Sequence, residues 1–161
     1  MIQKIFVIIT LFVTLFLTGS NAFANDADGA RAFFNAYVQA ANSYSAAVAE
    51  MYSPDAKIIR QVIKPDGTLV DVNTDTATYI KQMKIGQAGA KLRQYKNTYT
   101  DITVTPAGKD SYKISSLRQP SGESYKLKTY MIVKKQPDGK WLITEEMMQT
   151  KVQTFLKYAN K

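Results

Sequence analysis

Three short segments that contain proline and glycine divide the second half of this chain into stretches of strand length. They are Pro106–Lys109, Pro120–Gly122 and Pro137–Gly139. Proline presets one backbone dihedral angle and glycine supplies a positive one, so such segments are typical of turns. The spacing predicts a meander of four strands, near residues 95–106, 110–119, 123–135 and 140–151.

The first half predicts two helices separated by a strand pair. Residues 26–52 read as one amphipathic helix, because apolar residues recur three or four apart. Strands over Lys57–Lys64 and Thr68–Asn73 flank the turn Pro65-Asp66-Gly67. The second helix is expected from about Asp75, with Thr74 as its N-cap. We expect two glycines, Gly86 and Gly89, to end or kink it.

Residues 1–24 have the pattern of an export signal. A short start with Lys4 as its one charge leads into an uncharged apolar run, Ile5–Leu17, and Ala22-Phe23-Ala24 provides a small-residue cleavage site. The apolar run is shorter than the roughly 20 residues that cross a bilayer. We therefore expect cleavage near Ala24, a periplasmic or secreted location, and no integral membrane segment in the mature domain, residues 25–161.

Neither cysteine nor histidine occurs in the chain. This composition excludes disulfides, thiolate nucleophiles and the serine–histidine–aspartate triad. It also removes the commonest metal ligand and the commonest general base near neutral pH. Asp71 and Asp75 flank a loop but form at best a weak calcium site. We therefore expect no metal and no cofactor.

The chain carries a net charge of +8, without a run of five or more basic residues. This indicates either an ordinary solvated surface or attraction to anionic lipid, polysaccharide or nucleic acid. An exported protein rarely meets nucleic acid, so we do not expect nucleic-acid binding. Between Thr76 and Thr100 there are five basic residues and no acidic one, which fits a solvated helix side or a docking patch.

Two short motifs in a defined order resemble those of a known superfamily. Met51-Tyr52-Ser53-Pro54-Asp55-Ala56 ends the first helix, and Asp138-Gly139-Lys140-Trp141-Leu142-Ile143 opens the last strand. With the order of elements, they resemble the nuclear transport factor 2-like superfamily, which includes SnoaL-like polyketide cyclases. The resemblance covers nearly all of residues 26–150.

That resemblance implies an α+β cone of one domain, also called cystatin-like. A curved antiparallel sheet of about six strands packs on N-terminal helices and leaves a pocket between them. Members of the superfamily include isomerases, cyclases, dehydratases, ligand binders and assembly domains, and many dimerise through the sheet. A homodimer of this kind is therefore one expectation. The fold alone does not select one activity.

The resemblance also suggests where the inner wall lies in the last strand. Trp141 and Ile143 match inward positions, so strand alternation directs Glu145 and Met147 inward and Glu146 outward. Burial in an apolar cavity would make Glu145 a candidate general acid or base. The alternative is a carboxylate near the sheet rim, paired with a lysine.

Arg118 and two tyrosines are the other candidates. An inward Arg118 would hold a carboxylate or phosphate at the cone mouth; otherwise it pairs with Glu145 or lies in water. The two tyrosines, on the apolar side of the first helix, either direct hydroxyls into the pocket or pack as core. The ligand-lining residues that we predict are Tyr37, Tyr44, Arg118, Met131 and Met147.

Three functions remain open from the sequence. The first is a binding module for a small, mostly apolar or weakly acidic ligand. The second is an interaction domain of the cell envelope or of a secretion system, with Tyr130 and Ile132 on the exposed sheet face. The third is an enzyme of isomerase, cyclase or dehydratase type that uses Glu145. The absence of any catalytic motif favours the first.

Overall fold

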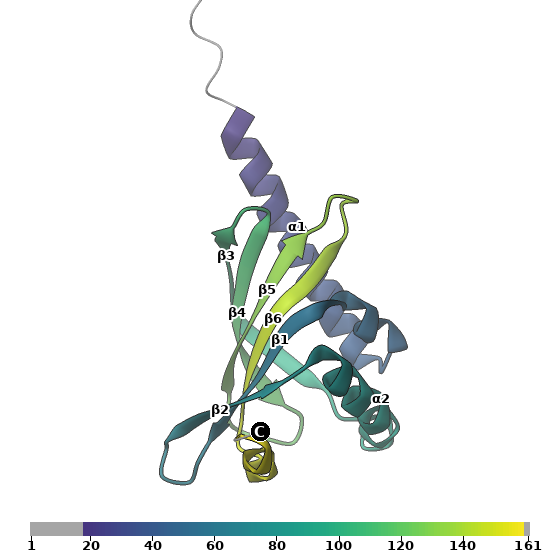
Figure 1. Ribbon diagram of the computed structural model, residues 1–161, viewed down its shortest axis with the longest axis vertical. Coiled ribbons are helices and arrows are strands. Elements are labelled where there is room, and N and C mark those ends of the chain that lie inside the picture. Colours follow the sequence, from purple (N-terminus) through teal and green to yellow (C-terminus); the bar gives the residue numbers. More distant parts are fainter. Residues whose placement is uncertain (1–17, 160–161) are drawn as a thin grey trace, which may run out of the picture.

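Six strands form one strongly twisted sheet, shown in the computed structural model of Figure 1, which describes residues 18–159, with side chains from residue 26. The strands are β1 (Tyr52–Ile63), β2 (Leu69–Thr74), β3 (Asn97–Gly108), β4 (Ser111–Pro120), β5 (Leu127–Lys135) and β6 (Trp141–Thr150). Their order across the sheet is β2-β1-β6-β5-β4-β3. The four strands of the expected meander are confirmed.

Two α-helices cover one face of this sheet. They are α1 (Thr18–Asn42) and α2 (Thr76–Leu92), and two short 3₁₀ helices, η1 (Ala46–Met51) and η2 (Gln153–Tyr158), complete the fold. In Figure 1, α1 runs diagonally behind the sheet, and α2 lies beside the lower end of β1. The expected α+β fold class is therefore confirmed.

One expectation about the sheet needs correction, because the sheet is mixed. Four of its strand pairs are antiparallel, but β1 and β6 are parallel. The chain enters β1 directly from η1 and enters β6 from a hairpin with β5. These two connections bring both strands into the middle of the sheet in the same direction, which local turn signals do not reveal.

The core lies between α1 and the inner face of the sheet. Phe34 of α1 is 2% exposed and packs edge-on against Tyr99 of β3, with ring centroids 5.4 Å apart. Near the middle of α1, Gly29 admits the indole ring of Trp141, because an added Cβ would lie only 3.3 Å from it. The other core residues of α1 with the lowest exposure are Ala30 and Tyr37.

The first helix ends earlier than its apolar pattern predicts. It stops at Asn42, and Tyr44 adopts a φ of 58°, in the left-handed region. The amide of Ser45 then bonds the carbonyl of Ala40, which closes the helix end. Ser45 caps η1, which continues the apolar contacts through Val48. The apolar spacing therefore continues without interruption, although the chain changes from an α-helix to a 3₁₀ helix within it.

The second helix also differs from the prediction at both ends. Asp75, not Thr74, is its N-cap, and the Asp75 carboxylate accepts the amide of Thr78 at 2.8 Å. The helix continues through Gly86 and Gly89 to Leu92. Only Thr76 of this helix is buried, so α2 packs shallowly against the rest of the fold.

The expected turn chemistry is confirmed at the β1–β2 and β5–β6 connections. Gly67 and Gly139 adopt φ angles of 85° and 84°, where an L side chain would be strained. In each turn an aspartate side chain accepts an amide two residues later: Asp66 from Thr68, and Asp138 from Lys140. The expected export signal, residues 1–24, lies mostly outside the described residues.

Candidate functional site

A cavity of about 300 Å³ opens between α1, α2 and the inner face of the sheet. Its walls are mostly aromatic and aliphatic, and they include Tyr79 and Met83 from α2 and Phe155 from η2. Two guanidinium groups also line it, Arg60 from β1 and Arg118 from β4. The expected hollow between sheet and helices is therefore present.

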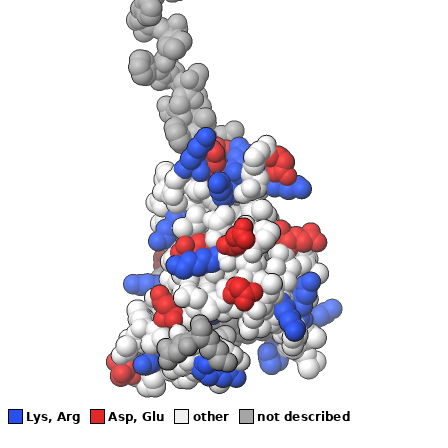
Figure 2. All heavy atoms as spheres, viewed as in Figure 1, with Lys and Arg blue, Asp and Glu red and all other residues white. Residues whose placement is uncertain are grey.

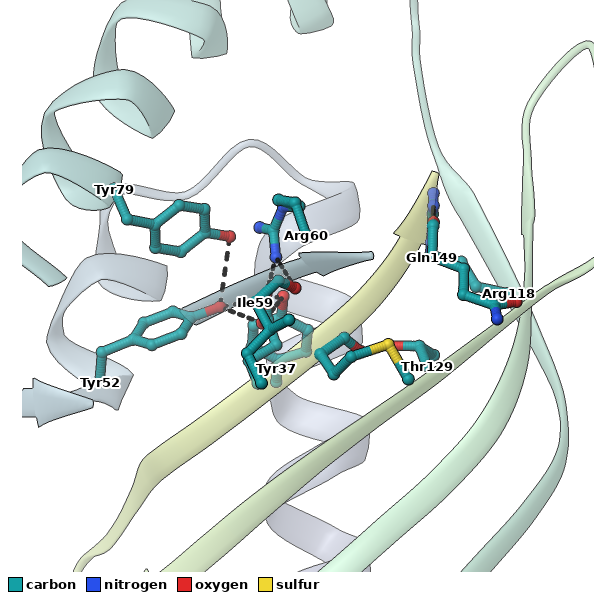
Figure 3. Close-up of polar contacts among 10 residues, drawn as sticks. Tyr37, Tyr52, Ile59, Arg60, Tyr79, Arg118, Thr129 and Gln149 are labelled. Carbon is teal, nitrogen blue, oxygen red and sulfur yellow. Dashed lines mark hydrogen bonds and ion pairs between the residues drawn. The ribbon is translucent and has the colours of Figure 1, made fainter. Parts of the chain in front are cut away.

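Behind one wall of the cavity lies a buried carboxylate, that of Glu146. Its side chain is fully buried, and its Oε1 pairs with Nη1 of Arg60 at 2.9 Å. Its Oε2 accepts the hydroxyl of Tyr52 at 2.5 Å and that of Tyr37 at 3.3 Å. The hydroxyl of Tyr79 lies 3.4 Å from that of Tyr52 and extends the network toward the cavity. Figure 3 shows the labelled members of this network, which come from β1 and the two helices: Tyr37, Tyr52, Arg60 and Tyr79.

The tyrosines of this network stay protonated. Burial raises the pKa values of Tyr37 and Tyr52 well above the ordinary value, and the charge of Glu146 raises them further. The pKa of Tyr79 is raised by the same two causes, although Arg60 opposes the effect. Neutral hydroxyls can donate to the carboxylate, so the network holds Glu146 with both oxygens occupied.

The guanidinium of Arg60 remains charged in this setting. Burial disfavours the cation, but interactions with Tyr79 and Glu146 outweigh that effect and raise the pKa of Arg60 above its ordinary value. The guanidinium also lies over the ring of Tyr79, with Cζ 4.7 Å from the ring centroid. Arg60 and Glu146 therefore compensate each other's charge within the protein.

Arg118 has no such compensation. It is 7% exposed, and its two terminal nitrogens donate to Oδ1 of Asn97 and to the carbonyl of Gln149, each at 2.9 Å. No carboxylate in the described part of the chain lies within ion-pair distance of it. Its Nε–H is buried and has no hydrogen-bond partner among the residues that the structure describes. Burying a cation without an opposite charge, and with one N–H donor unsatisfied, costs free energy. An anion at this wall of the cavity would reduce that cost.

A second buried polar atom without a partner lies at the same cavity. The hydroxyl of Tyr44 makes no hydrogen bond to any described residue, and Tyr44 lines the cavity. Gln87 of α2 donates to the carbonyl of Tyr44, which ties the helix to this turn. Tyr44 and Arg118 thus both line the cavity, and each has one donor without a partner among the described residues.

The carboxylate that faces the core is Glu146 and not Glu145, because β6 contains a bulge. Ile132 pairs with Glu145 and Val133 pairs with Ile143, so Thr144 has no pairing partner. One extra residue reverses the alternation beyond it, so Ile143 and Glu146, three apart, share the inner face. The expected orientations of Glu145 and Glu146 are therefore wrong.

Glu145 and Met147 lie on the outer face of the sheet. Glu145 accepts the hydroxyl of Tyr130 at 2.5 Å, and Met147 pairs across the sheet with the same tyrosine. Met148 takes the place at the cavity that was expected for Met147. Glu145 thus lacks the apolar cavity on which its proposed acid–base role depended.

The remaining predicted residues take the expected side. Tyr37 and Tyr44 both line the cavity, and Arg118 faces it from β4. Met131 is on the inner face but belongs to the packed core, at 3% exposure, and does not reach the cavity. The prediction therefore identified three of the residues at the cavity wall.

Sequence reasoning missed Arg60, Tyr52, Tyr79 and Glu146. One signal was available: Arg60 lies two residues from both Ile58 and Val62, which are fully buried, so alternation alone directs it inward. Tyr52 was assigned to a helix end and in fact begins β1. Glu146 was hidden by the bulge, which no residue pattern in β6 reveals.

The described residues contain no cluster of acidic side chains suited to a metal ion. Among residues 18–159, no helix combines the length and apolar character that a membrane crossing requires. Comparison of the sequence with protein families and with curated proteins finds no match.

Solved structures, in contrast, match this fold. A Nostoc punctiforme domain of unknown function with a cystatin-like fold is 16% identical, with a TM-score of 0.57 and coverage of 83% of this chain and 84% of its own. An NTF-2-like protein of unknown function from Shewanella oneidensis is 13% identical, with a TM-score of 0.57 and coverage of 76% and 98%.

A third protein, from Shewanella frigidimarina, is named provisionally as a ketosteroid isomerase. It is 19% identical, with a TM-score of 0.51 and coverage of 76% of this chain and 94% of its own. Identities this low show a shared fold and not a shared activity. The chain therefore shares its fold with cystatin-like and NTF-2-like proteins, as the resemblance of its motifs and element order predicted.

Proposed function

We propose that this chain is an exported binding protein for a small, mostly apolar ligand that carries one carboxylate. The carboxylate contacts Arg118, and the apolar part fills the space between α2 and the inner sheet. The single observation that carries this proposal is the buried Arg118 guanidinium, which has a free Nε–H and no counter-ion within the described residues.

The charge balance at the cavity supports an acid over a neutral ligand. Arg60 and Glu146 neutralise each other at 2.9 Å, so Arg118 leaves one positive charge in excess at the wall. Arg118 and Tyr44 line the same cavity, and each has a polar atom without a partner among the described residues, so a bound carboxylate would give the guanidinium a counter-ion. A neutral ligand would leave the buried cation uncompensated.

The size and lining support a molecule of one or two rings or a medium-length chain. A volume of about 300 Å³ lies at the small end of the range for ligand sites. Met83, Tyr99 and Phe155 offer apolar surface from three different elements. Aromatic walls bind flat apolar groups well, because the rings add edge and stacking contacts.

An enzymatic role has less support from this geometry. The carboxylate of Glu146 already accepts from Arg60, Tyr52 and Tyr37, so neither oxygen is free to abstract a proton. Glu145 lies on the opposite face of the sheet. A binding function needs neither carboxylate to leave its partners.

Export rests on the sequence pattern of residues 1–24. In a bacterial host, N-terminal sequencing of the periplasmic or secreted protein should find Asn25 first; an uncut cytoplasmic product contradicts export.

Binding is tested with matched acids and alcohols. Titration calorimetry compares 2-naphthoate with 2-naphthol and decanoate with decanol. Each acid should bind about tenfold or more tightly than its alcohol, because a charged hydrogen bond to Arg118 adds roughly 1.5–3 kcal/mol. In Arg118→Gln this preference should disappear.

The control is Arg93→Gln, which removes an exposed guanidinium beyond the end of α2 and should keep the preference. Thermal melting establishes that each variant is folded. If acid and alcohol bind equally to the natural chain, or if none of the four compounds binds, the assignment of Arg118 as an anion-binding residue is wrong.

A further inference from the structure

The outward face of α2 combines basic and apolar side chains. Lys81, Ile85, Ala88 and Leu92 recur at helical spacing and form one stripe, opposite the face that lines the cavity. Lys84 and Lys91 lie beside that stripe, seven residues apart. We call these six residues the α2 face and use the name in that sense below.

Its two large apolar residues are the most exposed of their kind among the described residues. Ile85 is 72% exposed and Leu92 is 86% exposed. Side chains this open make almost no contact within the fold, so the packing of α2 does not explain them. Exposed apolar groups that share a helix face are typical of an interaction surface.

The charge of this region has one sign. From Thr76 to Thr100 there are five basic residues and no acidic one. Lys81, Lys84 and Lys91 are exposed, and no hydrogen bond or ion pair to a described residue engages their ammonium groups. Figure 2 shows blue side chains at the lower right, over α2, without red ones among them. The charge of the α2 face therefore favours an anionic partner.

We propose that the α2 face docks on the surface of a membrane that contains anionic phospholipids. Lysines reach phosphate headgroups while their aliphatic stems and the two apolar side chains enter the boundary region. A nucleic acid or polysaccharide would meet the same charge but would leave Ile85 and Leu92 in water. The apolar pair therefore favours a lipid surface over other polyanions.

The position of α2 gives this docking a consequence. Tyr79, Met83 and Ala90, on the opposite side of the same helix, line the cavity. A helix that lies on the membrane with one face and borders the cavity with the other brings the cavity next to the lipid. An apolar ligand dissolved in the bilayer would then have a short path to it. The docking itself does not depend on the proposed ligand.

Vesicle sedimentation with the full chain tests the proposal. The probes are vesicles of phosphatidylglycerol mixed with phosphatidylethanolamine, and vesicles of phosphatidylcholine alone. We expect binding to the first, weakening as salt is added, and little binding to the second. The double variant Lys81→Glu with Lys84→Glu should bind at least 25-fold more weakly, at roughly fivefold for each lysine lost near an anionic surface.

The matched control is Lys128→Glu with Lys134→Glu, on exposed positions of β5, which changes the net charge by the same amount. It should lose much less affinity than the α2 variant. Ile85→Ser with Leu92→Ser should also reduce binding, at unchanged charge. Both α2 pairs are exposed, so their melting temperatures should stay near that of the natural chain.

Three results would overturn the proposal. Equal losses in the two lysine pairs would mean that net charge alone drives binding. Undiminished binding of the Ile85 and Leu92 variant, together with displacement by heparin, would mean that the surface recognises a polyanion and not lipid. Undiminished binding of every variant would mean that residues outside α2, such as the apolar run Ile5–Leu17, hold the chain on the vesicles.

Discussion

Arg60 of β1 and Glu146 of β6 form an ion pair at 2.9 Å across the parallel strand pair at the centre of the sheet. Glu146 is fully buried, and Tyr52 donates to its second oxygen at 2.5 Å. The pair explains how a carboxylate is accommodated inside an apolar core. It also distinguishes the two arginines of the cavity wall. The charge of Arg60 is neutralised by Glu146, whereas Arg118 has no carboxylate partner among the described residues.

Removing the charge of Glu146 should destabilise the fold far more than the same change one residue earlier. Glu146→Gln leaves the Arg60 cation buried without a partner, so we expect the free energy of unfolding to fall by about 3 kcal/mol. Glu145→Gln, on the outer face, should change it by less than about 1 kcal/mol. Urea denaturation measures both. Equal losses, or the reverse order, would contradict the bulge at Thr144.

Adding a side chain at two helical glycines should change the stability of the protein in opposite directions. A Cβ on Gly86 meets no atom within 4 Å, so Gly86→Ala should stabilise the protein by about 0.5–1 kcal/mol through a less flexible unfolded chain. A Cβ on Gly29 lies 3.3 Å from the indole of Trp141, so Gly29→Leu should cost about 1–3 kcal/mol. Thermal unfolding distinguishes them; a gain in both would place Trp141 away from α1.

Stability should fall with rising pH in the alkaline range. Burial, together with the hydrogen bond to Glu145 and its charge, raises the pKa of Tyr130 to about 12, whereas in the unfolded chain it lies near 10. The folded state therefore retains a proton that the unfolded state loses. The stabilisation is complete below about pH 10 and decreases as the pH rises toward 12.

The variant Tyr130→Phe isolates this contribution. Tyr37 and Tyr52 shift in the same direction and keep part of the alkaline slope in the variant. The slope of unfolding free energy against pH should therefore become shallower between about pH 10 and 12. The change should correspond to about one proton fewer in the difference between the folded and unfolded states. Guanidinium denaturation over that range measures it, and an unchanged slope would mean that Tyr130 ionises equally in both states.

The N-cap of α2 should make the protein more sensitive to acid. The amide of Thr78 lowers the pKa of Asp75 below its ordinary value, so the carboxylate stabilises the fold above that value and loses this effect as the pH falls. Asp75→Ala should lower the melting temperature at neutral pH. Asp75→Asn should retain the cap, with weaker pH dependence below about pH 4.

Asp66 provides the comparison for this effect. The amide of Thr68 lowers its pKa in the same way, so Asp75→Asn should keep the acid sensitivity that comes from Asp66. Melting curves at several acidic pH values measure the difference. The cap assignment fails if Asp75→Ala melts at the same temperature as the natural chain.

Local residue patterns predicted most of the architecture. The four meander strands, the turns at Gly67 and Gly139 and the two helices all follow from proline, glycine and apolar spacing, which act over a few residues. The same local signals misjudged the end of α1, because apolar spacing continues through Tyr44 and Val48 into η1. Periodicity alone does not distinguish one helix from two joined by a left-handed residue.

The candidate site depended more on contacts between distant segments. Tyr37, Tyr44 and Arg118 were predictable because each lies on a regular helix or strand face. Glu146 was not, because a single unpaired residue, Thr144, reverses the faces of β6 between Ile143 and Glu145. The ion pair with Arg60 further requires β1 and β6 to be parallel neighbours, although they are separated by most of the domain.

By itself, the sequence determined the class of fold, the order of its elements and the absence of histidine and cysteine chemistry, because these depend on residue identity and on short-range spacing. Only the tertiary structure decided which carboxylate is buried and which arginine has no counter-ion among the described residues. Both depend on strand register and on the pairing of segments far apart in the chain. One extra residue in a strand moves the side chains beyond it from one face of the sheet to the other.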